Sequence, residues 1–344
     1  MPISASQFFY ERFGCKVYRL SLDAGCTCPT RDGTLGTRGC IFCSAMGSGE
    51  FTGAAKAKDC SAICPPEGLR AVPSVKDQIR AAKALVASKA HGRSGKRECR
   101  YIAYFQNFTS TYGNTAFLAA KYREALAVPE VAGIAIATRP DCISDDILAE
   151  IAALAETPLS AFKTEPADKA SSAFKTCART DSEAPFVSIE LGLQSSKPET
   201  ALYIRRGYEN AVYEDAVRRI RKASERIHIV THIIFGLPGE TEDEMLDTVR
   251  YVARSPFAAD GIKFTVLHVL EGTDLAEEWR AGRVTCMSQE EYFAVLGKAL
   301  ALLPESMVVH RLTGDGPKKL LLAPLWTADK KRVLNELGKL FRKY

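Results

Sequence analysis

The sequence of 344 residues predicts an α/β protein built on a partial (β/α)6 barrel of the TIM type, followed by a small C-terminal helical extension. Two observations carry this prediction. Six short runs are rich in β-branched and aromatic residues, and stretches with helical periodicity lie between them; this alternation is typical of a parallel sheet. No GxGxxG opens a helix after the first run, which disfavours the alternative, an open doubly wound sheet.

The elements follow one another along most of the chain. The expected strands are Val17–Leu22, Tyr101–Gln106, Gly133–Thr138, Phe186–Leu191, His228–Phe235 and Ile262–His268. Helices are expected between them, for example at Val75–Lys89, Tyr213–Ser224 and Glu242–Arg254. Six strand–helix units of this kind suit one large barrel domain.

Two segments interrupt the pattern. Residues 54–73 are rich in Ala, Lys, Cys and Pro, and residues 157–185 are rich in Ala, Ser, Thr and Lys with almost no apolar periodicity. Both are predicted to be inserted surface loops. The barrel pattern stops after residue 272, so we expect a barrel over 1–272 and a C-terminal extension over 273–344.

Charge is nearly balanced over the chain but not at its end. The net charge of +5 does not by itself indicate nucleic-acid binding. The last fifteen residues hold one acid and six basic side chains: Lys330, Lys331, Arg332, Lys339, Arg342 and Lys343. These residues are expected to form a helix whose basic side chains are either simply solvated or contact phosphates.

The sequence predicts a cytoplasmic protein. It has no stretch of about 18 apolar residues, which a membrane-spanning helix would need, and its N-terminus does not resemble a signal peptide. Eleven cysteines in such a chain favour free thiols, a metal or a cluster over disulfides.

Four of these cysteines lie directly after the first expected strand, in GCTCPTRDGTLGTRGCIFC. Cys26 and Cys28 precede a glycine-rich loop, and Cys40 and Cys43 form a CxxC pair. Converging thiolates need a loop that folds back sharply, which glycines allow. A structural Zn(Cys)4 site is one interpretation. An iron–sulfur cluster is favoured, because the carboxyl ends of barrel strands are where active sites are built.

The same loop resembles that of the YhcC/YtqA-like group of radical S-adenosylmethionine (SAM) proteins, relatives of the Elongator catalytic subunit. Their CPxRDGTxGxGGCxFC pattern is matched by residues 28–34 and 39–43. Further blocks of the family appear in order along nearly the whole chain: YFQNFTSTYGNT, ATRPDC, IELGLQS, RRGY, HIIFGLPGET, GIKFTVLHVLEGT and LLAPLW. The resemblance implies that Cys28, Cys40 and Cys43 are the ligands. Cys26 is then an additional cysteine, either a packed hydrophobe or a fourth ligand.

Cofactors and chemistry also follow from the resemblance. Three cysteines hold a [4Fe-4S] cluster whose remaining iron binds SAM. Reductive cleavage of SAM gives methionine and a 5′-deoxyadenosyl radical, which abstracts hydrogen from a substrate. An electron donor of the flavodoxin or ferredoxin type is implied as a partner.

Several residues in these blocks are expected to contact SAM. The resemblance places Phe42 near adenine, with core packing as the alternative. Gln106 ends the second strand, where it contacts SAM or caps the loop. Glu190 and Gln194 flank the end of the fourth strand and are expected to bind ribose hydroxyls.

Other assignments concern the remaining strand ends. Arg206, or its neighbour Arg205, is expected to pair with the SAM carboxylate, or else to form a surface salt bridge. Gly236 and Gly239 of GLPGE would let the backbone approach adenine. Cys142, after the third strand, is expected to act as a hydrogen donor, with an inert packed thiol as the alternative.

Three functions remain open at this stage. The first is a radical SAM enzyme that modifies the side chain of tRNA wobble uridine, with the basic C-terminal residues contacting phosphates; acetyl transfer is not expected. The second is a radical SAM enzyme acting on a protein or small molecule. The third is a non-enzymatic, zinc-stabilised binding module.

Overall fold

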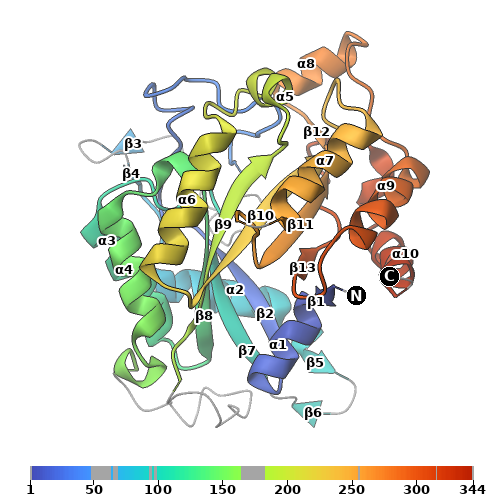
Figure 1. Cartoon of the computed structure of the whole chain (residues 1–344). Helices are drawn as coiled ribbons and strands as arrows, with labels where there is room; N and C mark the ends of the chain where they lie inside the picture. Colours follow the sequence, from blue (N-terminus) through green and yellow to red (C-terminus); the bar gives the residue numbers. More distant parts are fainter. Residues whose placement is uncertain are drawn as a thin grey trace.

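The sheet at the centre of the molecule has eight strands, all parallel and curled into a partial barrel (Figure 1). The computed structural model describes residues 2–47, 63–64, 69–92, 95–96, 99–163, 183–254, 256–314 and 316–342. The strands, in order across the sheet, are β1 (Ile3–Ser4), β13 (Val308–Arg311), β11 (Gly261–Val266), β10 (Ile227–Phe235), β9 (Phe186–Gln194), β8 (Val131–Thr138), β7 (Cys99–Phe105) and β2 (Lys16–Leu22).

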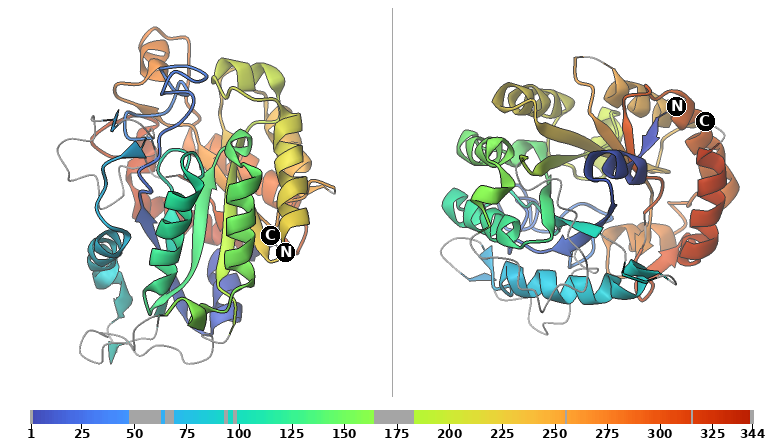
Figure 2. Two further views of the ribbon diagram at one scale, coloured as in Figure 1. Left: turned by 90° about the vertical axis from the view of Figure 1, so that its left-hand side faces the viewer. Right: turned by 90° about the horizontal axis from the view of Figure 1, so that it is seen from below.

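Helices cover the outer face of this sheet (Figure 2). They are α2 (Val75–Ala90), α3 (Thr115–Ala127), α4 (Asp145–Glu156), α6 (Asn210–Ala223), α7 (Glu242–Ala253), α9 (Gln289–Ala301) and α10 (Lys330–Phe341). The helix α1 (Ala5–Phe13) lies across the amino-terminal end of the barrel, between β2 and β13, whereas α5 (Pro198–Tyr203) and α8 (Asp274–Arg280) lie beyond the carboxyl ends of the strands. Polar side chains cap the N-termini of several helices. Thr241 and Ser288, for example, each form a capping box with the glutamate three residues later. Three short antiparallel pairs complete the described part: β3 (Ile63–Cys64) with β4 (Leu69–Arg70), β5 (His91–Gly92) with β6 (Gly95–Lys96), and β12 (Val269–Leu270) with β14 (Leu321–Ala323).

The core lies between the sheet and its helices. Every residue of β7 is buried, and the side chains of β8, β9 and β10 that face outward pack against α3, α4, α6 and α7. Burial on both faces explains why these strands read as continuous apolar runs in the sequence. The inner face carries an apolar cluster that packs against α1, and charged side chains nearer the carboxyl ends of the strands.

The six predicted strands are confirmed to within a few residues, and the helical C-terminal part is confirmed by α8, α9 and α10. Two strands of the main sheet were missed, and the three short antiparallel pairs were not predicted either. β13 lies beyond residue 272 and pairs in parallel with β11, so the main sheet continues across the predicted boundary. β1 then pairs with β13. Strands of two and four residues are too short to show a period in the sequence.

Most of the two predicted insertions, residues 54–73 and 157–185, lie outside the described residues. Within the part of the chain that the structure describes, no helix is long and apolar enough to cross a membrane.

Candidate functional site

A cavity of about 170 Å³ lies at the carboxyl ends of the parallel strands. The loop after β2 contributes Cys28, Cys40 and Cys43 to its lining. Strand ends on β7, β8, β9 and β10 contribute most of the rest, including Gln106, Thr138, Arg139, Gln194 and His232. Parallel strands end at one edge of a sheet, so the cysteine loop and the GLPGE turn after β10 lie at the same end, as the sequence predicted.

Backbone hydrogen bonds shape the cysteine loop. The amides of Arg31 and Asp32 both donate to the carbonyl of Cys28, and the amide of Gly39 donates to the carbonyl of Thr30 at 2.8 Å. The amide of Cys43 donates to the carbonyl of Cys40 at 3.0 Å, which closes the CxxC turn. The loop therefore folds back so that its two ends meet.

The three cavity cysteines influence one another electrostatically. Burial, together with the neighbouring Cys43 and Cys28, raises the pKa of the Cys40 thiol to about 12, while Arg139 and Arg31 oppose this shift. A protonated Cys40 thiol is thus favoured until a metal takes up the thiolate. Among the described residues, no group of three or more His, Cys, Asp or Glu side chains is arranged to hold a single metal ion.

Cys26 is placed differently. Its side chain is fully buried among apolar residues of the main core, and burial raises its pKa to about 12. It is also absent from the described lining of the cavity. Of the two alternatives considered for Cys26, this geometry favours a packed hydrophobe.

A buried ion pair anchors the base of the cysteine loop. Asp23, directly after β2, accepts from Arg70 at 2.7 Å and from Asn107 at 2.6 Å. Arg70 also donates from Nε to the carbonyl of Cys26 at 3.0 Å. The segment beyond residue 69 is therefore tied to the start of the loop.

The floor of the cavity is charged. Glu190 on β9 accepts from Arg19 Nη1 at 2.8 Å and from His232 Nε2 at 2.9 Å, and it also accepts from Lys263 Nζ. Lys263 Nζ in turn lies 3.1 Å from the hydroxyl of Tyr104. Interiors of TIM barrels are ordinarily filled by branched apolar side chains, so a charged network here is a departure from that filling.

The charges on the floor can be assigned. Burial raises the pKa of Glu190, but Lys263 and Arg19 outweigh burial and hold that pKa well below its usual range. Burial lowers the pKa of His232 to about 4 and also lowers that of Lys263. Glu190 is therefore an ionised carboxylate, and His232 is a neutral ring that donates to it.

Residues with a strained backbone conformation also lie around the cavity. Phe108, Gln194 and Arg205 are the described non-glycine residues with positive φ, at 51°, 63° and 57°. Phe108 and Gln194 line the cavity, and the carbonyl of Arg205 lies 3.8 Å from Cys40 Sγ. Strained residues of this kind persist where the surrounding structure holds them, and they cluster at functional sites.

Comparison with known proteins agrees with this geometry. The Radical SAM superfamily model matches residues 176–252, and the Radical_SAM C-terminal domain model matches residues 259–343. Protein YtqA of Bacillus subtilis is 34% identical over 329 residues, covering 96% of this chain and 86% of YtqA. YhcC of Escherichia coli is 30% identical over 336 residues, covering 95% and 90%. The chain belongs to the radical SAM superfamily, in the group of YtqA and YhcC.

More distant relatives match only part of the chain or only the fold. Elongator complex protein 3 of Drosophila melanogaster is 28% identical over 134 residues, which is 39% of this chain and 24% of that protein. The structure of archaeal Elp3 from Methanocaldococcus infernus aligns with a TM-score of 0.55 and 16% identity, over 77% of this chain and 59% of that one. This last likeness shows a shared fold.

Membership of the radical SAM superfamily implies a [4Fe-4S] cluster and SAM. The residues present fit the cluster, because three thiols from one loop line one cavity while Cys26 packs elsewhere. Three thiolates leave one iron without a protein ligand, as binding of SAM requires.

Five residues predicted to contact SAM line the cavity of this radical SAM protein: Phe42, Gln106, Glu190, Gln194 and Arg206. Their contact with SAM stays a prediction. Glu190 is already bound to three protein partners, and a ribose contact would have to share its oxygens.

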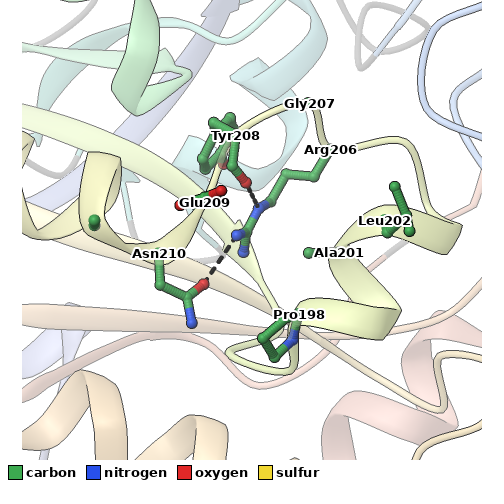
Figure 3. Close-up of a pocket in the computed structure, with 9 residues that line it drawn as sticks. Pro198, Ala201, Leu202, Arg206, Gly207, Tyr208, Glu209 and Asn210 are labelled. Carbon is green, nitrogen blue, oxygen red and sulfur yellow. Dashed lines mark hydrogen bonds between the residues drawn. The ribbon is translucent and has the colours of Figure 1, made fainter.

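Arg206 is also engaged within the protein (Figure 3). Its guanidinium donates to the carbonyls of Tyr208, Leu193 and Ser195 and to Asn210 Oδ1, at 2.8–3.0 Å. It forms the wall between the cavity and a neighbouring hollow of about 550 Å³. This geometry favours a role in holding the loop over an ionic contact with the SAM carboxylate.

Cys142, predicted as a catalytic residue, lies in another hollow with Asp32, Tyr112 and Asp141. It is not among the described residues that line the cluster cavity. The 3-10 turn Pro140–Cys142 carries the thiol away from the strand end, and its Sγ lies 3.5 Å from Asp141 Oδ1. A role as hydrogen donor in the cavity is therefore not supported by its position.

Gly236 and Gly239 do adopt the left-handed conformation, each at φ 80°. Neither is in the described lining of the cavity. A Cβ at Gly236 would lie 2.8 Å from Met287 Cγ, so the close approach that requires glycine there is to a protein side chain.

Sequence reasoning assigned no role to Arg139 or Tyr208, which both line the cavity. Arg139 pairs with Asp141 at 2.7 Å, and its guanidinium lies 5.0 Å from the centre of the Tyr208 ring. The signal was present, because both residues belong to the ATRPDC and RRGY blocks.

Proposed function

We propose that Cys28, Cys40 and Cys43 hold a [4Fe-4S] cluster and that the protein reductively cleaves SAM bound beside it. The supporting observation is that these three thiols, from one loop, line a cavity at the carboxyl ends of the barrel strands. When bound, the cluster and SAM supply a 5′-deoxyadenosyl radical for hydrogen abstraction. An electron donor of the flavodoxin or ferredoxin type would provide the electron.

The protein's own residues then bind and orient SAM and the substrate and enclose them in the cavity. Phe42 and Phe108 offer aromatic faces in the cavity lining, while the amides of Gln106 and Gln194 offer hydrogen bonds to polar groups of SAM. Glu190 and its partners form a fixed polar floor, against which a substrate with hydrogen-bonding groups can be held.

We propose tRNA as the substrate, with modification of the wobble-uridine side chain as the reaction. Partial similarity supports this proposal, since the tRNA uridine(34) acetyltransferase of Dehalococcoides mccartyi is 28% identical over 138 residues, covering 40% of this chain and 30% of that protein. The second support is α10, whose cations Lys330, Lys331, Arg332, Lys339 and Arg342 are all exposed.

The position of α10 limits how such an RNA would bind. The helix packs on α9 through Val333 and Leu337, on the flank of the barrel and away from α5 and α8 at the cavity end (Figure 1). An RNA held there must extend along the flank to reach the cavity. A protein or small-molecule substrate would use the same cavity and polar floor without α10.

One experiment tests the enzyme and the substrate together. Anaerobically reconstituted protein is incubated with SAM, a chemical reductant and bulk tRNA, and the nucleosides are analysed by mass. We expect 5′-deoxyadenosine and a new modified uridine. Formation of 5′-deoxyadenosine without any change in the tRNA would contradict tRNA as the substrate and favour a protein or small molecule. A colourless protein that holds zinc and forms no 5′-deoxyadenosine would contradict the enzyme itself.

A further inference from the structure

The side chain of Arg31 joins the two ends of the cysteine loop. Its Nη2 donates to the carbonyl of Cys43 at 2.8 Å and to the carbonyl of Ser44 at 2.7 Å. Its backbone amide donates to the carbonyl of Cys28 at 2.8 Å. One residue thus connects the first cavity cysteine to the last.

The middle cysteine is held by the same side chain. Gly39, which directly precedes Cys40, is in the left-handed conformation at φ 72°. A Cβ at this position would lie 2.8 Å from Arg31 Nε. Glycine therefore lets the backbone before Cys40 press against the guanidinium, so that Arg31 touches all three cysteine-bearing segments.

Arg31 is itself fixed in place and faces the cavity. It is part of the cavity lining, and its guanidinium lies 5.7 Å from the centre of the Phe108 ring, in cation–π range. Phe108 is one of the strained residues at the end of β7. The position of the charge is thus set by the strand end as well as by the loop.

We propose that Arg31 is a positioning residue for the iron–sulfur cluster, holding the three thiols in convergence and stabilising the reduced cluster by its charge. The proposal rests on the cysteine ligands proposed above. Reduction adds one negative charge to the cluster, and hydrogen bonding and charge around a cluster tune its potential. A fixed cation beside the cysteine loop therefore favours the reduced form.

Two substitutions separate the two parts of this role. Arg31→Lys keeps the positive charge but loses the planar guanidinium, whose Nη2 reaches the carbonyls of Cys43 and Ser44 while its Nε lies against Gly39. Arg31→Gln loses the charge as well. Arg38→Gln is the matched control, because Arg38 lies in the same loop with its side chain 73% exposed and its guanidinium 3.5 Å from Asp274 on α8.

The measurements need no substrate. Each variant is reconstituted anaerobically, circular dichroism checks its fold, and the rate of iron loss to a ferrous chelator is followed. The midpoint potential is measured by titration monitored by electron paramagnetic resonance, without SAM. We expect both Arg31 variants to lose iron about tenfold faster than the wild type or more, as loss of supporting interactions weakens metal sites.

The potentials should differ between the variants. Arg31→Gln is expected to hold about tenfold less reduced cluster at a fixed poise, a shift of about −59 mV for a one-electron couple. Arg31→Lys should stay near the wild-type potential, and Arg38→Gln should match the wild type in both measurements. If Arg31→Gln takes up too little cluster for a titration, faster iron loss from Arg31→Lys supports the positioning role.

Two outcomes would overturn different conclusions. Wild-type iron retention and potential in Arg31→Gln would refute the role of Arg31. Cys28→Ala with a fully retained cluster would instead refute the ligand assignment, because Arg31 would then serve a site that these cysteines do not form.

Discussion

Replacing Glu190 by glutamine tests the charged floor of the cavity directly. The carboxylate is fully buried, and it faces Lys263, whose side chain is 3% exposed, and Arg19, whose side chain is 21% exposed. Glutamine keeps the shape of the side chain and removes the charge. Lys263 then remains buried, and Arg19 partly buried, without the carboxylate that they share.

The expected loss of stability is large. Removing one partner of a buried ion pair costs about 3–5 kcal/mol, because the other charge stays buried and uncompensated. A chain of this length has an unfolding entropy of about 0.7 kcal/mol per kelvin near its midpoint, so Tm should fall by about 4–7 °C. The exposed pair of Arg123 and Glu150, at 48% and 36% exposure, offers the control. Glu150→Gln should lower Tm by less than about 1.5 °C.

Thermal melts of preparations with matched iron content make the comparison, since bound ligands would otherwise shift Tm. The double variant Glu190→Gln, Lys263→Met should regain much of the loss, because an apolar residue of similar size needs no counter-charge. A Tm within 1.5 °C of the wild type for Glu190→Gln alone would refute the reasoning. It would mean that the buried charges are relaxed by water or by partners elsewhere.

The dependence on pH supplies a second check. The pKa of Glu190 is held below its usual range in the folded protein. Its contribution to stability is therefore complete above the unfolded pKa of about 4.3 and disappears as the pH falls through the lower folded value. The difference in Tm between wild type and Glu190→Gln should shrink on acidification below about pH 4. A difference that grows towards low pH would contradict the sign of the shift.

Three further predictions concern the loop and the tail. Alanine in place of any of the three cavity cysteines should remove most iron and abolish 5′-deoxyadenosine formation, whereas Cys26→Ala should keep its iron and its activity. Loss of the brown colour in Cys26→Ala would identify Cys26 as a ligand. Gly39→Ala should speed iron loss, because its φ and the contact with Arg31 exclude a Cβ; unchanged retention measured with a chelator would argue against a tight loop. Replacing Lys330, Lys331 and Arg332 together by glutamine should weaken tRNA binding and flatten its salt dependence, without affecting SAM cleavage in the absence of RNA; equal affinity in a salt titration would exclude α10 as a contact.

The architecture was predictable because the strands that build it are buried on both faces. Phe186–Leu191 and His228–Phe235 are rich in β-branched and aromatic residues with a few polar ones between them, and such short runs between helical stretches indicate parallel strands. β1 and β13 escaped for the opposite reason. Each is short and gains its strand conformation from neighbours more than forty residues away in the chain, and no local signal reports those neighbours.

The cysteine loop was predictable from spacing, whereas the charged floor was not. Cys40 and Cys43 are near in sequence, and the glycines between Cys28 and Cys40 indicate a loop that folds back. Glu190 meets Arg19 across 171 positions and Lys263 across 73. Which inner-face side chains meet is decided by strand order and register, and these are properties of the assembled barrel. The place of Cys142 was not predictable for a related reason, since one 3-10 turn puts its thiol in the neighbouring hollow.

The charged floor of the cavity is better explained by a role in binding than by a role in stability. An ion pair buried in a barrel is often no more stabilising than apolar side chains of the same volume, and apolar layers are the usual filling. Glu190 with its three donors, and Lys263 against the Tyr104 hydroxyl, therefore stabilise the fold little more than leucine or valine would in their place. What they add is a set of fixed dipoles and charges on buried side chains below the cysteine loop. Interactions are strong and directional there, so the floor is suited to hold a polar substrate group in one orientation.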